Sequence, residues 1–109
     1  DSLAMRIKHD LRQRPAQQWP ETDSLAHELC MSASTLRRRL AEEGQTYQGL
    51  KDSVRKELAV VWLAEADISF AEIASRLGFA DVSSFYKAFR KWSGSNPGHY
   101  RSLILTESS

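Results

Sequence analysis

Apolar residues along this chain recur every three or four positions, the spacing of one face of an α-helix. The longest such stretch covers about residues 47–65, and its apolar stripe consists of Tyr47, Leu50, Val54, Leu58, Val61 and Trp62. No segment of useful length alternates apolar and polar residues. The pattern therefore predicts an all-α protein.

Prolines, glycines and N-capping residues divide the chain into about seven helices. The predicted helices cover about residues 3–14, 24–29, 33–43, 47–65, 69–77 and 82–93, followed by a short seventh that opens at 96–97 and a frayed tail over 106–109. Ser32 and Asp81 are the expected N-caps of the third and sixth helices, and Gly44 is expected to end the third.

Two stretches of the chain resemble each other and form an internal repeat. Residues 25–31 align with residues 73–79 at an offset of 48, and beyond the turn Leu36 and Leu40 align with Phe85 and Phe89 at an offset of 49. The second turn therefore contains one additional residue. Each copy has a small alanine, a tight turn and two inward apolar residues four apart, which is the pattern of a helix-turn-helix.

With these motifs the chain resembles the DNA-binding domain of AraC/XylS-type transcription regulators. The resemblance covers about residues 22–101. The matching motifs are residues 26–32, 34–40, 43–44, 68–69, 72–74, 77–79, 84–85, 89, 94, 96–97 and 99–101. Cys30 stands where many members of the family have glycine, and Asn96 stands where serine is usual.

The resemblance implies two helix-turn-helix subdomains, residues 1–46 and 67–109, joined by a linker helix over residues 47–66. Each subdomain would place one recognition helix in successive major-groove segments on one face of double-stranded promoter DNA. The resemblance also implies a bacterial regulator located in the cytoplasm, at the nucleoid. Its effector-sensing or dimerising N-terminal domain would lie outside this chain, and such regulators often activate transcription by contacting RNA polymerase.

Helix geometry places Ser34, Arg37 and Arg38 on one exposed stripe of the third helix, opposite Leu36 and Leu40. An arginine can donate two hydrogen bonds to O6 and N7 of guanine, so the three residues of the stripe are predicted base contacts. Residues at the helix start and beside the stripe are predicted to bind phosphate: Ser32, Thr35 and Arg39.

The sixth helix carries the second predicted contact set. The resemblance points to Val82, Ser83, Ser84, Tyr86 and Lys87 as groove-facing residues. Helix geometry supports Ser83 and Lys87 and favours a phosphate contact for Ser84. The predicted base contacts are therefore Val82, Ser83, Tyr86 and Lys87, and the predicted phosphate contacts are Ser84, Arg90 and Lys91. Because this helix has no arginine near its start, the first repeat is predicted to supply more of the base specificity.

Several aromatic and basic residues receive a structural interpretation instead. Phe85, Phe89, Trp92 and Tyr100 are predicted core residues, because they are spaced along inward helix faces. Trp19 is predicted to pack beneath the first helix. Arg55, at the edge of the apolar stripe, is interpreted as an internal ion-pair partner and not as a DNA contact.

The overall charge gives no sign of a polyanionic partner. The chain has 15 Lys and Arg against 14 Asp and Glu, a net charge of +1, and every segment is nearly balanced. Within the two recognition helices, however, basic residues gather at positions 37–39 and at 87, 90 and 91. The alternative that the charge leaves open is a helical protein-interaction module with this fold but without DNA binding.

Nothing in the sequence favours an enzyme or a membrane protein. The three histidines lie far apart and there is one cysteine, so no zinc-ligand spacing exists and no metal or cofactor is expected. No serine lies in a nucleophile elbow, and the five glycines form no phosphate loop. No apolar run approaches the roughly 18 residues of a membrane helix.

Overall fold

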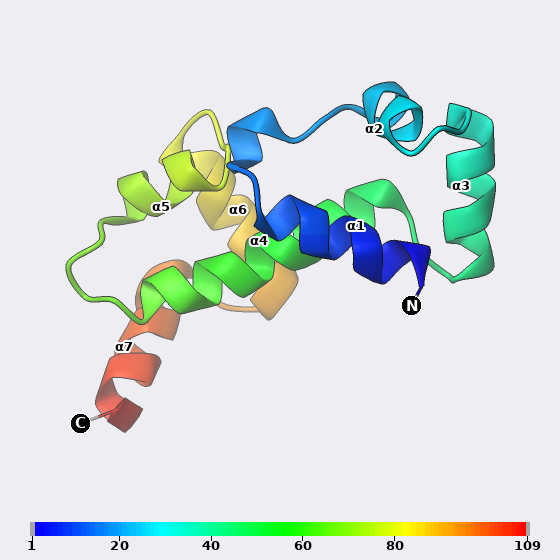
Figure 1. The fold of residues 1–109 in the computed structure, drawn as a ribbon. Coiled ribbons are helices and arrows are strands. Elements are labelled where there is room, and N and C mark those ends of the chain that lie inside the picture. The colour runs from blue at the N-terminus through cyan, green and yellow to red at the C-terminus, as the bar shows by residue number, and fades with distance from the viewer. Residues whose placement is uncertain (1, 109) are drawn as a thin grey trace. The chain divides into compact units, whose positions relative to one another are not determined.

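The computed structural model describes residues 2–108, which form seven α-helices and one short 3₁₀-helix with no strand among them (Figure 1). The elements are α1 (Leu3–Arg12), η1 (Ala16–Gln18), α2 (Thr22–Glu28), α3 (Ala33–Glu42), α4 (Tyr47–Leu63), α5 (Phe70–Arg76), α6 (Val82–Ser93) and α7 (Pro97–Ser108). The predicted all-α fold of about seven helices is confirmed. The chain divides into two compact units, Asp1–Val54 and Arg55–Ser109, and the boundary falls inside α4.

Each unit contains one short helix, a tight turn and a longer helix, and the two turns are closed by the same backbone hydrogen bond. Between α2 and α3, the N–H of Met31 donates to the carbonyl of Ala26 at 2.9 Å. Between α5 and α6, the N–H of Phe79 donates to the carbonyl of Ala74 at 3.0 Å. This is the six-to-one bond of the Schellman motif. The internal repeat of the sequence is therefore also a repeat of main-chain geometry.

The left-handed position of the two turns is occupied by different residue types. Cys30 has φ 59° in the first turn, and Gly78 has φ 85° in the second. A non-glycine residue in this conformation costs about 1–2 kcal/mol, and glycine costs about 0.4–1 kcal/mol through the entropy of the unfolded chain. We therefore expect Cys30→Gly to raise the free energy of unfolding by about 0.5–1 kcal/mol.

Urea unfolding of Cys30→Gly and of Gly78→Ala checks this expectation. The second variant puts a side chain into the same conformation in the other unit, so it should lower the free energy of unfolding by about 1 kcal/mol. If Cys30→Gly proved less stable than the wild type, the strain assigned to Cys30 would be wrong.

The first unit has a core to which each of its α-helices contributes. The buried residues, each no more than 6% exposed, are Leu3, Ala4, Ile7, Leu11, Leu25, Ala26, Leu36, Leu40, Tyr47, Leu50 and Val54. Four of them lie on α1 at helical spacing, so α1 presents a complete apolar face to this core. The helix-turn-helix of the first unit is therefore held from one side by a helix that is not part of it.

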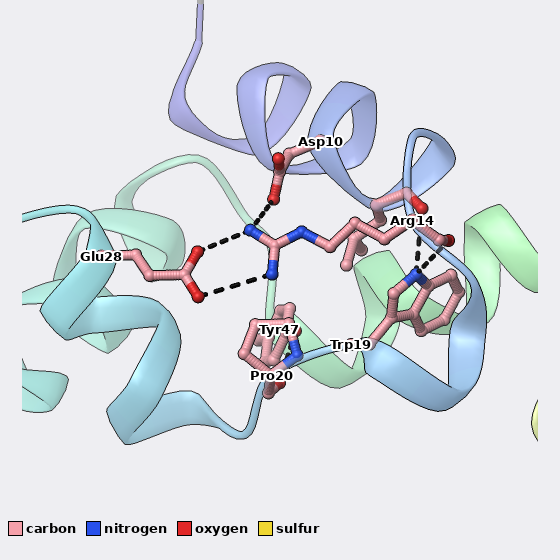
Figure 2. Close-up of polar contacts among 7 residues, drawn as sticks. Asp10, Arg14, Trp19, Pro20, Glu28 and Tyr47 are labelled. Carbon is pink, nitrogen blue, oxygen red and sulfur yellow. Dashed lines mark hydrogen bonds and ion pairs between the residues drawn. The ribbon is translucent and has the colours of Figure 1, made fainter.

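Arg14, two residues after α1 ends, ties α1 to α2 (Figure 2). Its guanidinium contacts the carboxylate of Glu28 with N–O distances of 2.5 and 3.4 Å, and that of Asp10 at 2.8 Å. The hydrogen bond from Arg14 holds the pKa of Glu28 below its ordinary value. The Arg14 side chain is 27% exposed and that of Glu28 is 43% exposed, so water still reaches this ion pair and its contribution to stability is modest.

Trp19 contacts the first helix, as predicted. Its indole N–H donates to the carbonyls of Leu11 and Arg14, at 2.9 and 3.2 Å, and so satisfies acceptors at the C-terminal end of α1 (Figure 2). The hydroxyl of Tyr47 donates to the carbonyl of Pro20 at 2.7 Å. Burial raises the pKa of Tyr47 to about 12, so this hydroxyl remains a donor at neutral pH.

The second unit has an aromatic core. Its fully buried members are Ala59, Leu63, Ile73, Ala74, Leu77, Phe85 and Phe89. The rings of Trp92 and Tyr100 pack against this cluster and lie 6.4 and 5.2 Å from the ring of Phe89, centre to centre. The core roles predicted for Phe85 and Phe89 are confirmed, and Trp92 and Tyr100 are partly buried against that core.

Three predicted helix ends are wrong by a few residues or more. The first helix ends at Arg12, where Gln13 and the Trp19 indole take up its last carbonyls. α4 ends at Leu63, and the side chain of Arg101 satisfies the free carbonyls at this end. The expected frayed tail is helical through Ser108, since no proline or glycine follows Gly98 to stop α7; residue 109 lies outside the described residues.

Candidate nucleic-acid interface

α3 presents a basic, hydroxyl-bearing face to solvent. Leu36 and Leu40 are 0% and 1% exposed, whereas Ser34, Arg37, Arg38 and Arg39 are all exposed. The helix is thus oriented as the sequence predicted, with the three proposed base contacts together on its outer side. What these side chains bind stays a prediction.

The start of α3 is fixed by its predicted cap. The Ser32 hydroxyl accepts a hydrogen bond from the N–H of Thr35 at 3.1 Å and donates to the Thr35 hydroxyl at 3.0 Å. Ser32 is exposed and Thr35 is half-buried. The two hydroxyls predicted to meet phosphate therefore lie next to each other, in the first turn of the helix, where backbone N–H groups favour an anion.

Arg38 of α3 forms an ion pair with an acidic neighbour on the same helix. A guanidinium nitrogen of Arg38 lies 3.3 Å from a carboxylate oxygen of Glu42, and both side chains are 64% exposed. An ion pair this open to water contributes little to stability, so Arg38 can exchange Glu42 for another acceptor at small cost.

α6 is oriented in the same way, with differences at its start. Ser83, Tyr86, Lys87, Arg90 and Lys91 are exposed, whereas Phe85 and Phe89 are fully buried. Val82 and Ser84 are only half-exposed. Val82 packs against the aromatic core, and the ring of Tyr86 meets Phe70 edge to face at 5.9 Å between ring centres. Among the base contacts predicted for α6, Ser83 and Lys87 therefore have the side chains most accessible to a DNA groove.

Asp81 caps α6, as predicted. Its carboxylate accepts the N–H of Ser84 at 2.8 Å, and this bond, together with one from the Ser84 hydroxyl, holds the pKa of Asp81 below its ordinary value of 3.8. The Ser84 hydroxyl predicted to bind phosphate is therefore already engaged with a carboxylate.

The lowered pKa of Asp81 makes stability depend on pH. A carboxyl group that has a lower pKa in the folded state than in the unfolded state stabilises the folded state. This stabilisation is complete at a pH above the unfolded-state pKa, and it is lost as the pH falls through the folded-state pKa. We expect Asp81→Asn, which keeps a capping oxygen, to be about as stable as the wild type at neutral pH and to lose less stability below pH 3.8. Thermal unfolding between about pH 2 and 7 checks this, and parallel curves for the two proteins would contradict it.

Two arginines bind backbone carbonyls inside the second unit, and the structural role of Arg101 was not predicted from the sequence. Arg101 donates to the carbonyls of Leu63 at 2.9 Å and Glu65 at 3.1 Å, at the end of α4. Arg55 donates to the carbonyl of Leu77 at 3.0 Å, at the end of α5, and its guanidinium lies 5.5 Å from the centre of the Phe79 ring. Arg55 has an internal role, as interpreted from the sequence, through a carbonyl and an aromatic ring, whereas the ion pair expected for it stays a prediction. No local signal identifies such partners, which lie 22 to 38 residues away.

Other kinds of site find no support in the described residues. No group of three or more histidine, cysteine, aspartate or glutamate side chains in residues 2–108 is arranged to hold a metal ion. Over the same residues, no helix is both long and apolar enough to cross a membrane.

Comparison with known proteins agrees with this geometry. The family model of a helix-turn-helix domain matches residues 25–102. The ornithine utilization regulator of Pseudomonas aeruginosa is 43% identical over 101 residues, which are 93% of this chain and 30% of the regulator. This chain therefore spans less than a third of that relative's length.

Two solved structures are similar over nearly the whole chain. The transcriptional regulator CdpR of Pseudomonas aeruginosa has a TM-score of 0.84 and 37% identity, over 91% of this chain and 31% of CdpR. A DNA-binding transcriptional dual regulator of Escherichia coli K-12 has a TM-score of 0.90 and 26% identity, over 97% of this chain and 95% of that one. The chain belongs to the helix-turn-helix family of AraC-type regulators and is a DNA-binding domain of a transcription regulator.

Proposed function

We propose that the chain binds promoter DNA in a sequence-specific way, with α3 and α6 as recognition helices in successive major-groove segments. One observation carries the proposal. In both units the helix after the tight turn buries two apolar residues four apart and exposes basic and hydroxyl side chains. The two proposed DNA-binding subdomains are residues 1–46 and 67–109, and residues 47–66 form the proposed linker helix.

The two recognition helices are proposed to differ in what they contribute. α3 would read bases through Ser34, Arg37 and Arg38 and hold phosphates through Ser32, Thr35 and Arg39. α6 would read bases through Val82, Ser83, Tyr86 and Lys87, and would hold phosphates through Ser84, Arg90 and Lys91. The half-burial of Val82 and the bond between Ser84 and Asp81 favour Ser83 and Lys87 as its principal base contacts.

We propose that an effector-sensing or dimerising domain precedes this one in the complete protein. Contact of the complete protein with RNA polymerase would allow it to activate transcription. The match of this chain to 30% of a regulator supports a longer protein. DNA binding would take place in the bacterial cytoplasm, at the nucleoid, without catalysis or a cofactor.

The dependence of duplex binding on salt tests the proposed function. Neutralisation of DNA phosphates by basic side chains releases counterions, so the affinity for a duplex should fall steeply as the salt concentration rises. In a plot of the logarithm of the binding constant against the logarithm of the salt concentration, each phosphate contact should contribute about 0.9 to the negative slope. A double variant, Arg90→Ala with Lys91→Ala, should reduce that slope by about 2. If the wild-type chain bound no duplex in a gel-shift assay across a random pool, the protein-interaction module would be the better explanation.

A further inference from the structure

Glu43 joins the end of α3 to the start of α1. It is the C-cap residue of α3, and its two carboxylate oxygens accept hydrogen bonds from the backbone N–H groups of Leu3 and Ala4, at 3.0 and 3.1 Å. These are N–H groups of the first turn of α1, which have no acceptor within their own helix. The glutamate thus caps a helix that lies 39 and 40 residues away in the sequence.

The position of Glu43 is unfavourable for α3 taken alone. A carboxylate at the C-terminal end of a helix is disfavoured by the helix dipole, whereas one at an N-terminal end is favoured. The bond from the Ala4 N–H contributes most to holding the pKa of Glu43 below its ordinary value, so the group is ionised at neutral pH. Most of the electrostatic benefit of this residue therefore comes from the contact between the two helices, and a smaller part comes from the charge of Arg39 on α3.

α1 is fixed to both helices of the first helix-turn-helix. Its N-terminal end is bound to α3 through Glu43, and Arg14, just beyond its C-terminal end, is bound to Glu28 of α2. Between these ties, Ile7 and Leu11 are buried, at 2% and 0% exposure. A rotation or shift of α3 relative to α1 would break the bonds at Leu3 and Ala4.

We propose that Glu43 is a positioning residue that couples the docking of α1 to the placement of α3, so that α1 docking and DNA binding by α3 stabilise each other. The proposal rests on the proposed function, since α3 must meet DNA for the coupling to be expressed. Coupling of this kind is reciprocal: if docked α1 favours DNA binding, bound DNA favours docked α1 by the same factor.

Hydrogen exchange at the Leu3 and Ala4 amides, measured by NMR, tests the coupling in the wild-type chain. The DNA is a duplex that the chain itself selects from a random pool. Saturation with this duplex should slow exchange at both amides by about fivefold or more, the lower end of typical allosteric coupling. Unchanged exchange in a chain that binds the duplex would overturn the proposal and leave the proposed function standing. Failure to bind any duplex would instead contradict the proposed function.

A matched pair of variants shows whether Glu43 carries the coupling. Glu43→Gln and Glu42→Gln each remove one negative charge from adjacent positions at the end of α3. Glu43 accepts hydrogen bonds from α1, whereas Glu42 pairs with Arg38 on its own helix. In Glu43→Gln we expect faster exchange at both amides without DNA and little further effect of DNA. In Glu42→Gln we expect the slowing seen in the wild type. Equal slowing in both variants would overturn the role of Glu43.

Discussion

Replacing Arg37 and Arg38 together with alanine is expected to remove most of the sequence preference of the first recognition helix. Both side chains are exposed on the outer face of α3, and the buried pair Leu36 and Leu40 fixes that face outward. A bidentate arginine–guanine contact supplies about 1–3 kcal/mol of discrimination, so loss of two such contacts should reduce selectivity by a factor of roughly 30 or more. The ion pair between Arg38 and Glu42 does not prevent this role, because both side chains are exposed to water and such pairs separate readily.

Selection from a random duplex pool by the wild type and the double variant measures this effect. The preferred bases should disappear over one half of the recovered site and persist over the half that we propose α6 reads. The control is the Arg90→Ala, Lys91→Ala double variant, which also removes two exposed cations but from proposed phosphate contacts. It should weaken binding to all sequences alike. An unchanged preference in the Arg37, Arg38 variant would refute base reading by these arginines.

Replacing Phe89 with alanine is expected to have the largest effect on stability. Phe89 is 0% exposed, and its ring centre lies 5.9 Å from that of Phe85 and 5.2 Å from that of Tyr100. Truncation of a buried phenylalanine costs about 3–5 kcal/mol because transfer energy is lost and a cavity remains. Typical domains have about 5–15 kcal/mol of stability in total, so the second unit should be close to unfolding.

Urea unfolding followed by circular dichroism measures the loss. Val61→Ala is the matched control, because Val61 is an apolar helix residue that is 58% exposed, and its truncation should change the free energy of unfolding by about 0.5 kcal/mol at most. A cost below about 1 kcal/mol for Phe89→Ala would mean that the aromatic core is not closed around this ring.

The fold could be predicted wherever its cause is local. The cap bonds of Ser32 and Asp81 each join residues three apart, and the turn bonds at Ala26 and Ala74 each join residues five apart. Such contacts depend on short stretches of sequence. The repetition of these stretches at an offset of 48 or 49 residues identified the two helix-turn-helix motifs. The orientation of α3 and α6 followed from helical periodicity alone.

The candidate site could be predicted less completely, for two physical reasons. The outward direction of Arg37 and Lys87 follows from the helix period, but the partial burial of the Val82 side chain depends on the core against which it packs. The engagement of Ser84 by Asp81 was equally absent from the prediction, since the same residue pattern fits a free hydroxyl.

By itself, then, the sequence determined two capped helix-turn-helix motifs with polar faces outward, because periodicity and caps act over a few residues. Only the tertiary structure decided which partners charged side chains bind when those partners are far away in the sequence. Nothing local in the sequence indicates that Glu28 binds Arg14 or that Glu43 binds the start of α1. The same holds for Arg101, which binds the end of α4. A charged side chain at the surface has many possible partners, and packing of the helices around a shared core selects one of them.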